Sequence, residues 1–243
     1  MRREISYLSV VAVAAPLAVS APPQHATEVT VSGGSGSYAS IGRGCNGEVL
    51  SKYPVDLKDA AVEASHKFPG PWRLGARAGV IDLESKDPFK ASYNARYVNP
   101  YLSLDWPSIS LGVGYFRANH PLPETYDDEA LHGTWNHASG HVRFGRPNFY
   151  FSAAYLEEMP IAAAGDVALG FGKAWRKSHV WLGTGAIPFD HFGLVAKADF
   201  RIAGGLAVGG TGRLGSSQGV SENTISLRIS YLMTRADSAR TGY

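Results

Sequence analysis

Residues 221–233 read SENTISLRISYLM, and this stretch decides the fold. Its apolar side chains occupy every second position, at Ile225, Leu227, Ile229, Tyr231 and Met233. Side chains of an extended strand alternate between its two faces, so a period of two predicts one apolar and one polar face. Many earlier stretches carry the same pattern, which indicates that this strand closes a large antiparallel β structure.

The chain begins with MRREISYLSVVAVAAPLAVSA, in which two arginines precede an apolar run from Tyr7 to Val19 and small residues follow. This layout is typical of a secretory signal peptide with cleavage after about Ala21. The run is shorter than the roughly 20 residues that span a membrane, and Pro16 interrupts it, so an N-terminal anchor fits less well. We predict an exported protein with a signal peptide at 1–21, one domain at 22–233 and a C-terminal tail at 234–243.

The composition excludes several classes of protein. After Ala21 there is no apolar stretch of about 18 residues, so the sequence offers no candidate for a spanning helix. The formal net charge is +2, and no basic stripe suited to nucleic acid is present. Cys45 is the only cysteine, which excludes an intramolecular disulfide and a cysteine-based zinc site. The 28 glycines and 11% aromatic residues match an architecture of many strands and turns.

Alternation and turn residues together predict twelve strands. In one of them, for example, Trp72 and Leu74 oppose Arg73 and Arg77. Connections after even-numbered strands are uniformly short, while those after odd-numbered strands vary and are often long. The predicted strands cover residues 27–40, 53–68, 72–85, 93–105, 108–119, 133–145, 148–157, 166–175, 178–187, 191–202, 204–214 and 222–233.

Short turns at one rim and longer loops at the other are typical of antiparallel transmembrane barrels, in which the short turns face the periplasm. Six aromatic residues lie within a few positions of the short turns or of the chain end. Such a set predicts a girdle at the level of the lipid headgroups. Its members are Trp72, Trp106, Phe149, Trp175, Phe200 and Tyr231.

From about residue 27 to residue 233, this layout resembles that of bacterial outer-membrane β-barrels. The resemblance implies an all-β fold, an antiparallel up-and-down transmembrane β-barrel of about 12 strands (range 8–12). It also implies residence in the outer membrane of a Gram-negative-type bacterium, contact with outer-membrane lipid, and assembly by the outer-membrane insertion machinery. One departure is the segment TRADSARTG between the last strand and Tyr243, because many members of the family end on an aromatic residue of that strand.

Charged residues on the polar faces predict the lining of the lumen. A charge that faces lipid in mid-strand costs several kcal/mol, so these faces must look inward. Their excess of positive charge would favour anions in an open lumen. The alternative is a network of ion pairs and hydrogen bonds that fills a narrow barrel. The predicted lining residues are Arg73, Arg77, His141, Arg143, Lys197, Asp199, Arg201 and Arg228.

One predicted strand carries His137, Ser139 and His141 on the face that it shares with Arg143. Outer-membrane lipid A deacylases use a Ser and a His in a similar relation, but their site faces lipid, whereas this face looks inward. Residues two apart on a strand are also about 6.5–7 Å apart, which is long for a nucleophile and its base. His137 and His141 lie about 13 Å apart along a strand, too far to share a metal ion. We therefore expect no catalysis, no metal and no cofactor.

The sequence predicts a structural barrel or a narrow, anion-leaning pore. Two alternatives stay open at this point. One is an outer-membrane hydrolase that modifies lipid A or phospholipid, with Ser139 as its nucleophile. The other is a soluble exported β-barrel that binds a ligand, because an antiparallel sheet with one polar face in water shows the same alternation.

Overall fold

The computed structural model describes residues 25–43, 45–46, 49–85, 92–119, 134–146, 148–155, 167–186, 192–203, 205–216 and 220–234. The predicted signal peptide and all but the first residue of the predicted tail lie outside these ranges. In the described residues no helix is long and apolar enough to cross a membrane.

Twelve strands make up the described part of the chain, as the sequence predicts. They are β1 (Ala26–Arg43), β2 (Val49–Lys67), β3 (Trp72–Ser85), β4 (Ser92–Asp105), β5 (Ile109–Ala118), β6 (Trp135–Arg146), β7 (Phe149–Tyr155), β8 (Val167–Ala174), β9 (Ser178–Ala186), β10 (Phe192–Ala203), β11 (Leu206–Ser216) and β12 (Val220–Thr234).

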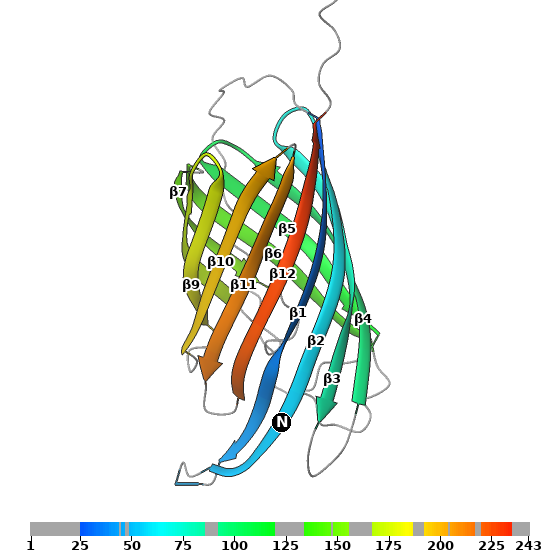
Figure 1. Ribbon diagram of the computed structural model, residues 1–243, viewed down its shortest axis with the longest axis vertical. Coiled ribbons are helices and arrows are strands. Elements are labelled where there is room, and N and C mark those ends of the chain that lie inside the picture. Colours follow the sequence, from blue (N-terminus) through cyan, green and yellow to red (C-terminus); the bar gives the residue numbers. More distant parts are fainter. Residues whose placement is uncertain are drawn as a thin grey trace, which may run out of the picture.

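The strands form one closed antiparallel barrel (Figure 1). Each strand pairs with its neighbour in sequence, and β1 closes the ring by pairing with β12. At mid-strand Val31 of β1 is the register partner of Ile229 on one side and of Val62 on the other. Closure leaves no unpaired edge, which a bilayer requires because it offers no water to unpaired backbone groups. The predicted fold class and strand number are confirmed.

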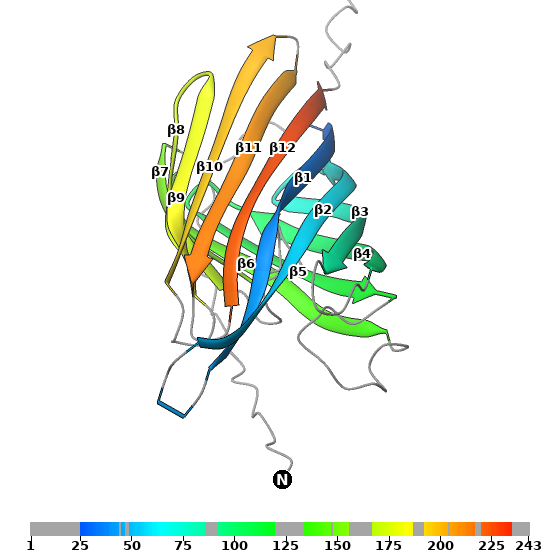
Figure 2. The same cartoon turned by 60° about the horizontal axis from the view of Figure 1, so that its bottom comes forward.

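The hairpin of β1 and β2 differs most from the prediction. The sequence predicts strands at 27–40 and 53–68, whereas the structure pairs the two strands in one register from Ala26 with Lys67 to Gly42 with Ser51, and a register shift then pairs Arg43 with Val49. Both views show this hairpin extending beyond its neighbours at the end opposite the short turns (Figures 1 and 2). Cross-strand pairing lengthens these strands although β1 contains the sequence GGSGS, which has no apolar alternation of its own.

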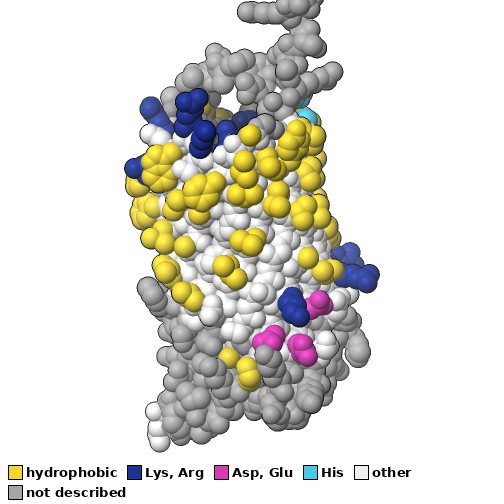
Figure 3. Space-filling model, viewed as in Figure 1, with side chains coloured by type: hydrophobic (Ala, Val, Ile, Leu, Met, Phe, Trp, Pro, Cys, Tyr) yellow, Lys and Arg dark blue, Asp and Glu magenta, His cyan; other side chains and the backbone are white. Residues whose placement is uncertain are grey.

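The outer surface is an apolar belt, and the alternation in the sequence creates it. On β12, Ile225, Leu227 and Ile229 are 57–67% exposed, while Thr224, which precedes Ile225 and points to the other face, is 4% exposed. On β3, Trp72 and Leu74 face outward in the same way. Figure 3 shows the belt as a broad field of hydrophobic side chains over the upper part of the barrel. A belt of this kind matches the hydrocarbon layer of a membrane.

The interior has an apolar core on one side and a polar region toward the other end. The apolar core is formed by inward side chains of β2–β5, with Leu57 2%, Ile81 0% and Phe116 1% exposed, while Arg213 of β11 and Thr224 of β12 are buried polar residues outside it. The ring of Phe116 stacks on that of Tyr97, with centroids 5.3 Å apart. This core lies in the half of the barrel near the longer connections, which we call the long-loop end. The polar region lies toward the short turns, which we call the short-turn end.

Candidate functional site

The polar region of the lumen contains a cavity of about 1120 Å³. All twelve strands contribute to its wall, and the turns at Gly70 and Pro71, at Trp106 and Pro107, and at Arg176 and Lys177 border it at the short-turn end. Every lumen residue predicted from the sequence lines this cavity: Arg73, Arg77, His141, Arg143, Lys197, Asp199, Arg201 and Arg228.

The wall of the cavity is strongly basic. Four acidic side chains line it, namely Glu28, Glu63, Asp105 and Asp199. Nine Lys and Arg side chains line it, namely Lys67, Arg73, Arg77, Arg143, Arg176, Lys177, Lys197, Arg201 and Arg228. Charges of one sign inside low-dielectric walls focus the electrostatic field, so this excess of cations sets the electrostatic character of the cavity.

One polar network runs along the cavity wall from β3 to β6. Arg73 donates from Nε to Oδ2 of Asp105 at 2.9 Å, and its Nη1 lies 3.8 Å from Glu28. Ser110 donates its hydroxyl proton to Oδ1 of Asp105 at 2.6 Å, and its Oγ lies 3.1 Å from Nε2 of His141. A hydroxyl has one proton to donate, so His141 is the donor to Ser110.

A second network joins β7, β9, β10 and β12. The hydroxyl of Tyr150 lies 2.7 Å from Nε2 of His179, and Nδ1 of His179 lies 3.2 Å from Asp199. Arg228 binds the same carboxylate through two hydrogen bonds of 2.7 Å. Bidentate contacts of this type fix both partners in orientation as well as distance.

Two further cations lie against aromatic rings on the same wall. The guanidinium of Arg143 is 5.5 Å from the ring centroid of Tyr150, and Nζ of Lys197 is 4.7 Å from the centroid of Trp181. The indole of Trp181 donates to Oγ of Ser152 at 2.8 Å, which fixes the ring on which Lys197 rests. Cation–π contacts help to hold these two charges on the cavity wall.

Glycines on neighbouring strands make room for the large inward side chains. A Cβ on Gly172 would lie 2.1 Å from the ring of Tyr150, and a Cβ on Gly112 would lie 2.3 Å from the ring of His141. Each ring therefore occupies the space that a side chain on the glycine of the next strand would need.

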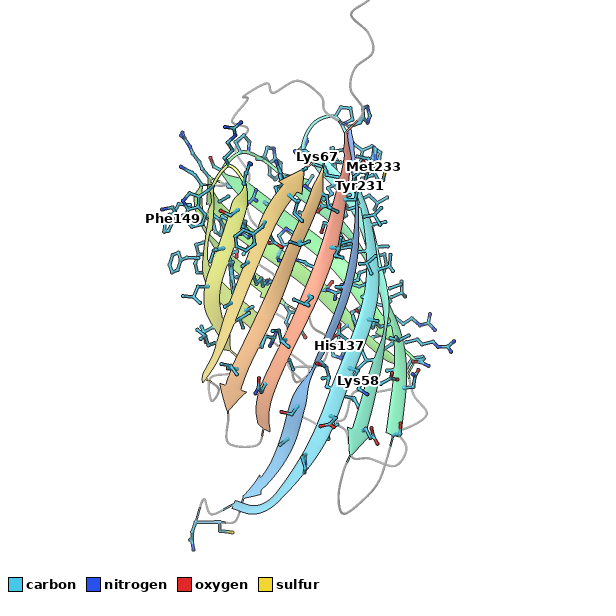
Figure 4. All side chains as sticks on the ribbon, viewed as in Figure 1. Lys58, Lys67, His137, Phe149, Tyr231 and Met233 are labelled. Carbon is cyan, nitrogen blue, oxygen red and sulfur yellow. The ribbon has the colours of Figure 1, made fainter. Side chains whose placement is uncertain are left out.

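The three weak catalytic candidates do not form a catalytic arrangement. Ser139 is buried and donates its hydroxyl proton to Oδ1 of Asn99 at 2.9 Å, so that proton is not shared with a histidine. His141 instead contacts Ser110, whose own proton goes to Asp105. His137 is half-buried outside the cavity lining (Figure 4). A nucleophilic serine needs its proton aimed at a base, and neither serine meets that requirement.

The predicted girdle residues are at the short-turn end, as Phe149 and Tyr231 illustrate in Figure 4. Trp72, Phe149, Trp175, Phe200 and Tyr231 are 48–60% exposed on the outer surface. Trp106 differs, because it is half-buried and borders the mouth of the cavity. In the part of the chain that the structure describes, no group of three or more His, Cys, Asp or Glu could hold a metal ion.

Sequence reasoning missed several residues of the cavity wall. Four of them face the cavity, namely Ser110, Tyr150, His179 and Trp181. The alternation of side chains along each strand would have been enough to place them inward. Their contacts depend on the register between strands, which no local pattern contains.

Comparisons with known proteins support the fold. No family model and no curated protein sequence matches the chain. The beta domain of the Bordetella autotransporter BrkA is 11% identical, with a TM-score of 0.54 and coverage of 85% of this chain and 99% of that one. The translocator domain of autotransporter NalP from Neisseria meningitidis is 10% identical, with a TM-score of 0.53 and coverage of 85% and 88%. The outer membrane protease OmpT from Escherichia coli is 9% identical over 87% and 96%, with a TM-score of 0.34, too low to support an inference.

The closed barrel, its apolar belt and its likeness to the two autotransporter domains identify an outer-membrane β-barrel. The chain is located in the bacterial outer membrane. A soluble exported barrel does not fit, because large apolar side chains such as Leu227 and Val113, each 67% exposed, would face water.

Proposed function

We propose that this barrel is a narrow pore that favours anions. The observation that supports the proposal is the charge of the cavity wall, with nine Lys and Arg side chains against four Asp and Glu side chains. Two of the cations hold carboxylates of the wall, because Glu28 and Asp105 contact Arg73 while Asp199 contacts Arg228. The wall thus keeps a positive excess, which favours anions over cations in a pore.

The apolar core of β2–β5 would set the width of this pore. Phe116 and Tyr97 project inward at the long-loop end, where the cavity does not reach. An anion would enter the wide basic chamber at the short-turn end and meet its constriction at these rings. We therefore expect a small conductance, well below that of a wide water-filled barrel.

Conductance across a planar lipid bilayer tests the proposal. The purified full chain is inserted under a KCl gradient, and the potential at zero current is measured. A chloride-selective pore gives discrete current steps and a zero-current potential displaced toward the equilibrium potential of chloride. A displacement toward the potential of potassium contradicts the proposal. If the inserted barrel gives no steps, its role is structural and the pore proposal fails.

Other roles receive less support. The two similar solved structures are autotransporter domains, but at 10–11% identity the likeness supports the fold alone. The hydrolase alternative is not favoured, since the proton of Ser139 is donated to Asn99. Export through a signal peptide at 1–21 stays a prediction, as does assembly by the outer-membrane insertion machinery.

A further inference from the structure

At the short-turn end, exposed Lys and Arg side chains gather at the ends of β6–β9 and at the turn that joins β8 to β9. Arg146 ends β6, Lys173 is near the end of β8, and Arg176 and Lys177 form the turn after β8. All four side chains are exposed. The short turns at 68–71 and 106–108 contain no Lys or Arg. Figure 3 shows this asymmetry as dark blue side chains gathered at the upper left, above the apolar belt.

Two of these cations lie on either side of an exposed aromatic ring. Arg146 is the register partner of Phe149 across β6 and β7. Tyr150 of β7 is the register partner of Gly172 of β8. Phe149 precedes Tyr150 in the sequence, and Lys173 follows Gly172. Neighbouring strands are about 4.8 Å apart, so the backbones of Arg146 and Lys173 are roughly 10 Å apart. Both long side chains can therefore reach one phosphate group above the ring of Phe149.

The rings beside these cations are arranged to contact acyl chains. Phe149 is 60% exposed and Phe171 is 56% exposed, and their rings stack with centroids 5.9 Å apart. Nζ of Lys173 lies 5.1 Å from the ring centroid of Trp175, a residue of the predicted girdle. We call Arg146, Phe149, Phe171 and Lys173 the basic–aromatic patch.

Carboxylates do not neutralise this surface. Among the described residues that face outward on β6–β9 there is no Asp or Glu. The long-loop end differs, because Arg96 faces outward there opposite Val80 of β3, two residues from Asp82, and Arg117 faces outward on β5. In Figure 3 the acidic side chains of this face likewise lie in the lower part of the barrel. The basic–aromatic patch thus combines unbalanced positive charge with an apolar surface at headgroup depth.

We infer that the basic–aromatic patch binds an anionic phospholipid, with Arg146 and Lys173 on its phosphate and Phe149 and Phe171 against its acyl chains. Lys and Arg near an anionic lipid surface each contribute binding energy, and aromatic rings at this depth anchor the same lipid. The inference depends on membrane insertion and is independent of whether the lumen conducts ions.

Native mass spectrometry of the full chain in detergent tests the inference. The chain is titrated with phosphatidylglycerol and, separately, with phosphatidylcholine. The wild type should bind phosphatidylglycerol more tightly than phosphatidylcholine. The double variant Arg146→Gln, Lys173→Gln should lose roughly tenfold or more of its affinity for phosphatidylglycerol and retain its affinity for phosphatidylcholine.

Two further variants make the result specific. Arg96→Gln combined with Arg117→Gln removes the same charge at the other rim and should leave the lipid preference unchanged. Arg146→Lys combined with Lys173→Arg keeps the charge and should also retain the preference. Equal binding of the two lipids by the wild type overturns the inference. So does an equal loss in the two double glutamine variants, since it would show a general effect of net charge.

Discussion

Arg228 on β12 binds Asp199 on β10 across an intervening strand. Nε donates to Oδ1 and Nη2 donates to Oδ2, both at 2.7 Å. Gly209 of β11 is the register partner of both residues. A Cβ at this position would lie 2.0 Å from Oδ1 of Asp199, so the ion pair passes through a space that only glycine leaves open.

Substituting Gly209→Ala should disturb this ion pair. The added methyl group would displace the carboxylate of Asp199, and it would also lie 2.7 Å from the carbonyl oxygen of Ala198. We expect a loss of about 1–3 kcal/mol in the free energy of unfolding, measured by urea titration in detergent. Gly212→Ala on the same strand is the control, because nothing lies within 4 Å of its added Cβ. Equal losses in the two variants would contradict the role of Gly209.

Charge reversal on the cavity wall should change ion selectivity. Arg143→Glu combined with Lys197→Glu replaces two cations of the lining with carboxylates. We expect the zero-current potential in a KCl gradient to move toward the equilibrium potential of potassium. Arg117→Glu is the control, since this exposed side chain faces outward on β5. An unchanged potential in the double variant would mean that the cavity does not carry the current.

Removing the ring of Phe116 should both destabilise the barrel and widen the pore. This ring is 1% exposed within the apolar core, so Phe116→Ala should cost about 3–5 kcal/mol in the free energy of unfolding. Single-channel recording should show a larger conductance step. Tyr115→Ala on the outward face, where the ring is 49% exposed, should leave the step unchanged. A conductance that Phe116→Ala does not raise would argue against a constriction at this ring.

A charge on the middle of the belt should oppose insertion. Leu227 is 67% exposed near the centre of β12, where the belt faces the hydrocarbon layer. Leu227→Arg should cost about 2–4 kcal/mol in folding into lipid vesicles, whereas Leu227→Met should be nearly neutral. Folding yields of the two variants into phosphatidylcholine vesicles measure the difference. If the arginine variant folds as well as the methionine variant, Leu227 does not face lipid.

The sequence predicts the strands and their faces well because those signals are local. The bounds of β3 agree with the predicted 72–85, since Trp72 follows a Pro-Gly-Pro turn and the alternation starts there. Arg73 and Arg77 face the lumen because burying them in lipid would be costly. A period of two and a turn residue are enough to derive each of these features.

Contacts between distant strands could not be derived in the same way. Tyr150 is 29 residues from His179 in the sequence, and His179 is 20 residues from Asp199. Only the register of the closed barrel brings the three together. The apolar core was missed for a related reason. Alternation along β5 places Phe116 inward, but it does not reveal that Ile81 and Leu57 of neighbouring strands lie at the same depth along the barrel axis. Depth depends on the tilt and stagger of all twelve strands.

Electrophoretic mobility of the outer-membrane fraction, compared between unboiled and boiled samples in detergent, tests the inserted closed barrel most directly. Every strand is paired and β1 closes on β12, so the barrel should stay folded in cold detergent. We predict recovery in that fraction, resistance to a carbonate wash, and a clear shift in mobility on boiling. Recovery in the soluble periplasm with no shift would contradict the membrane barrel and everything inferred from it.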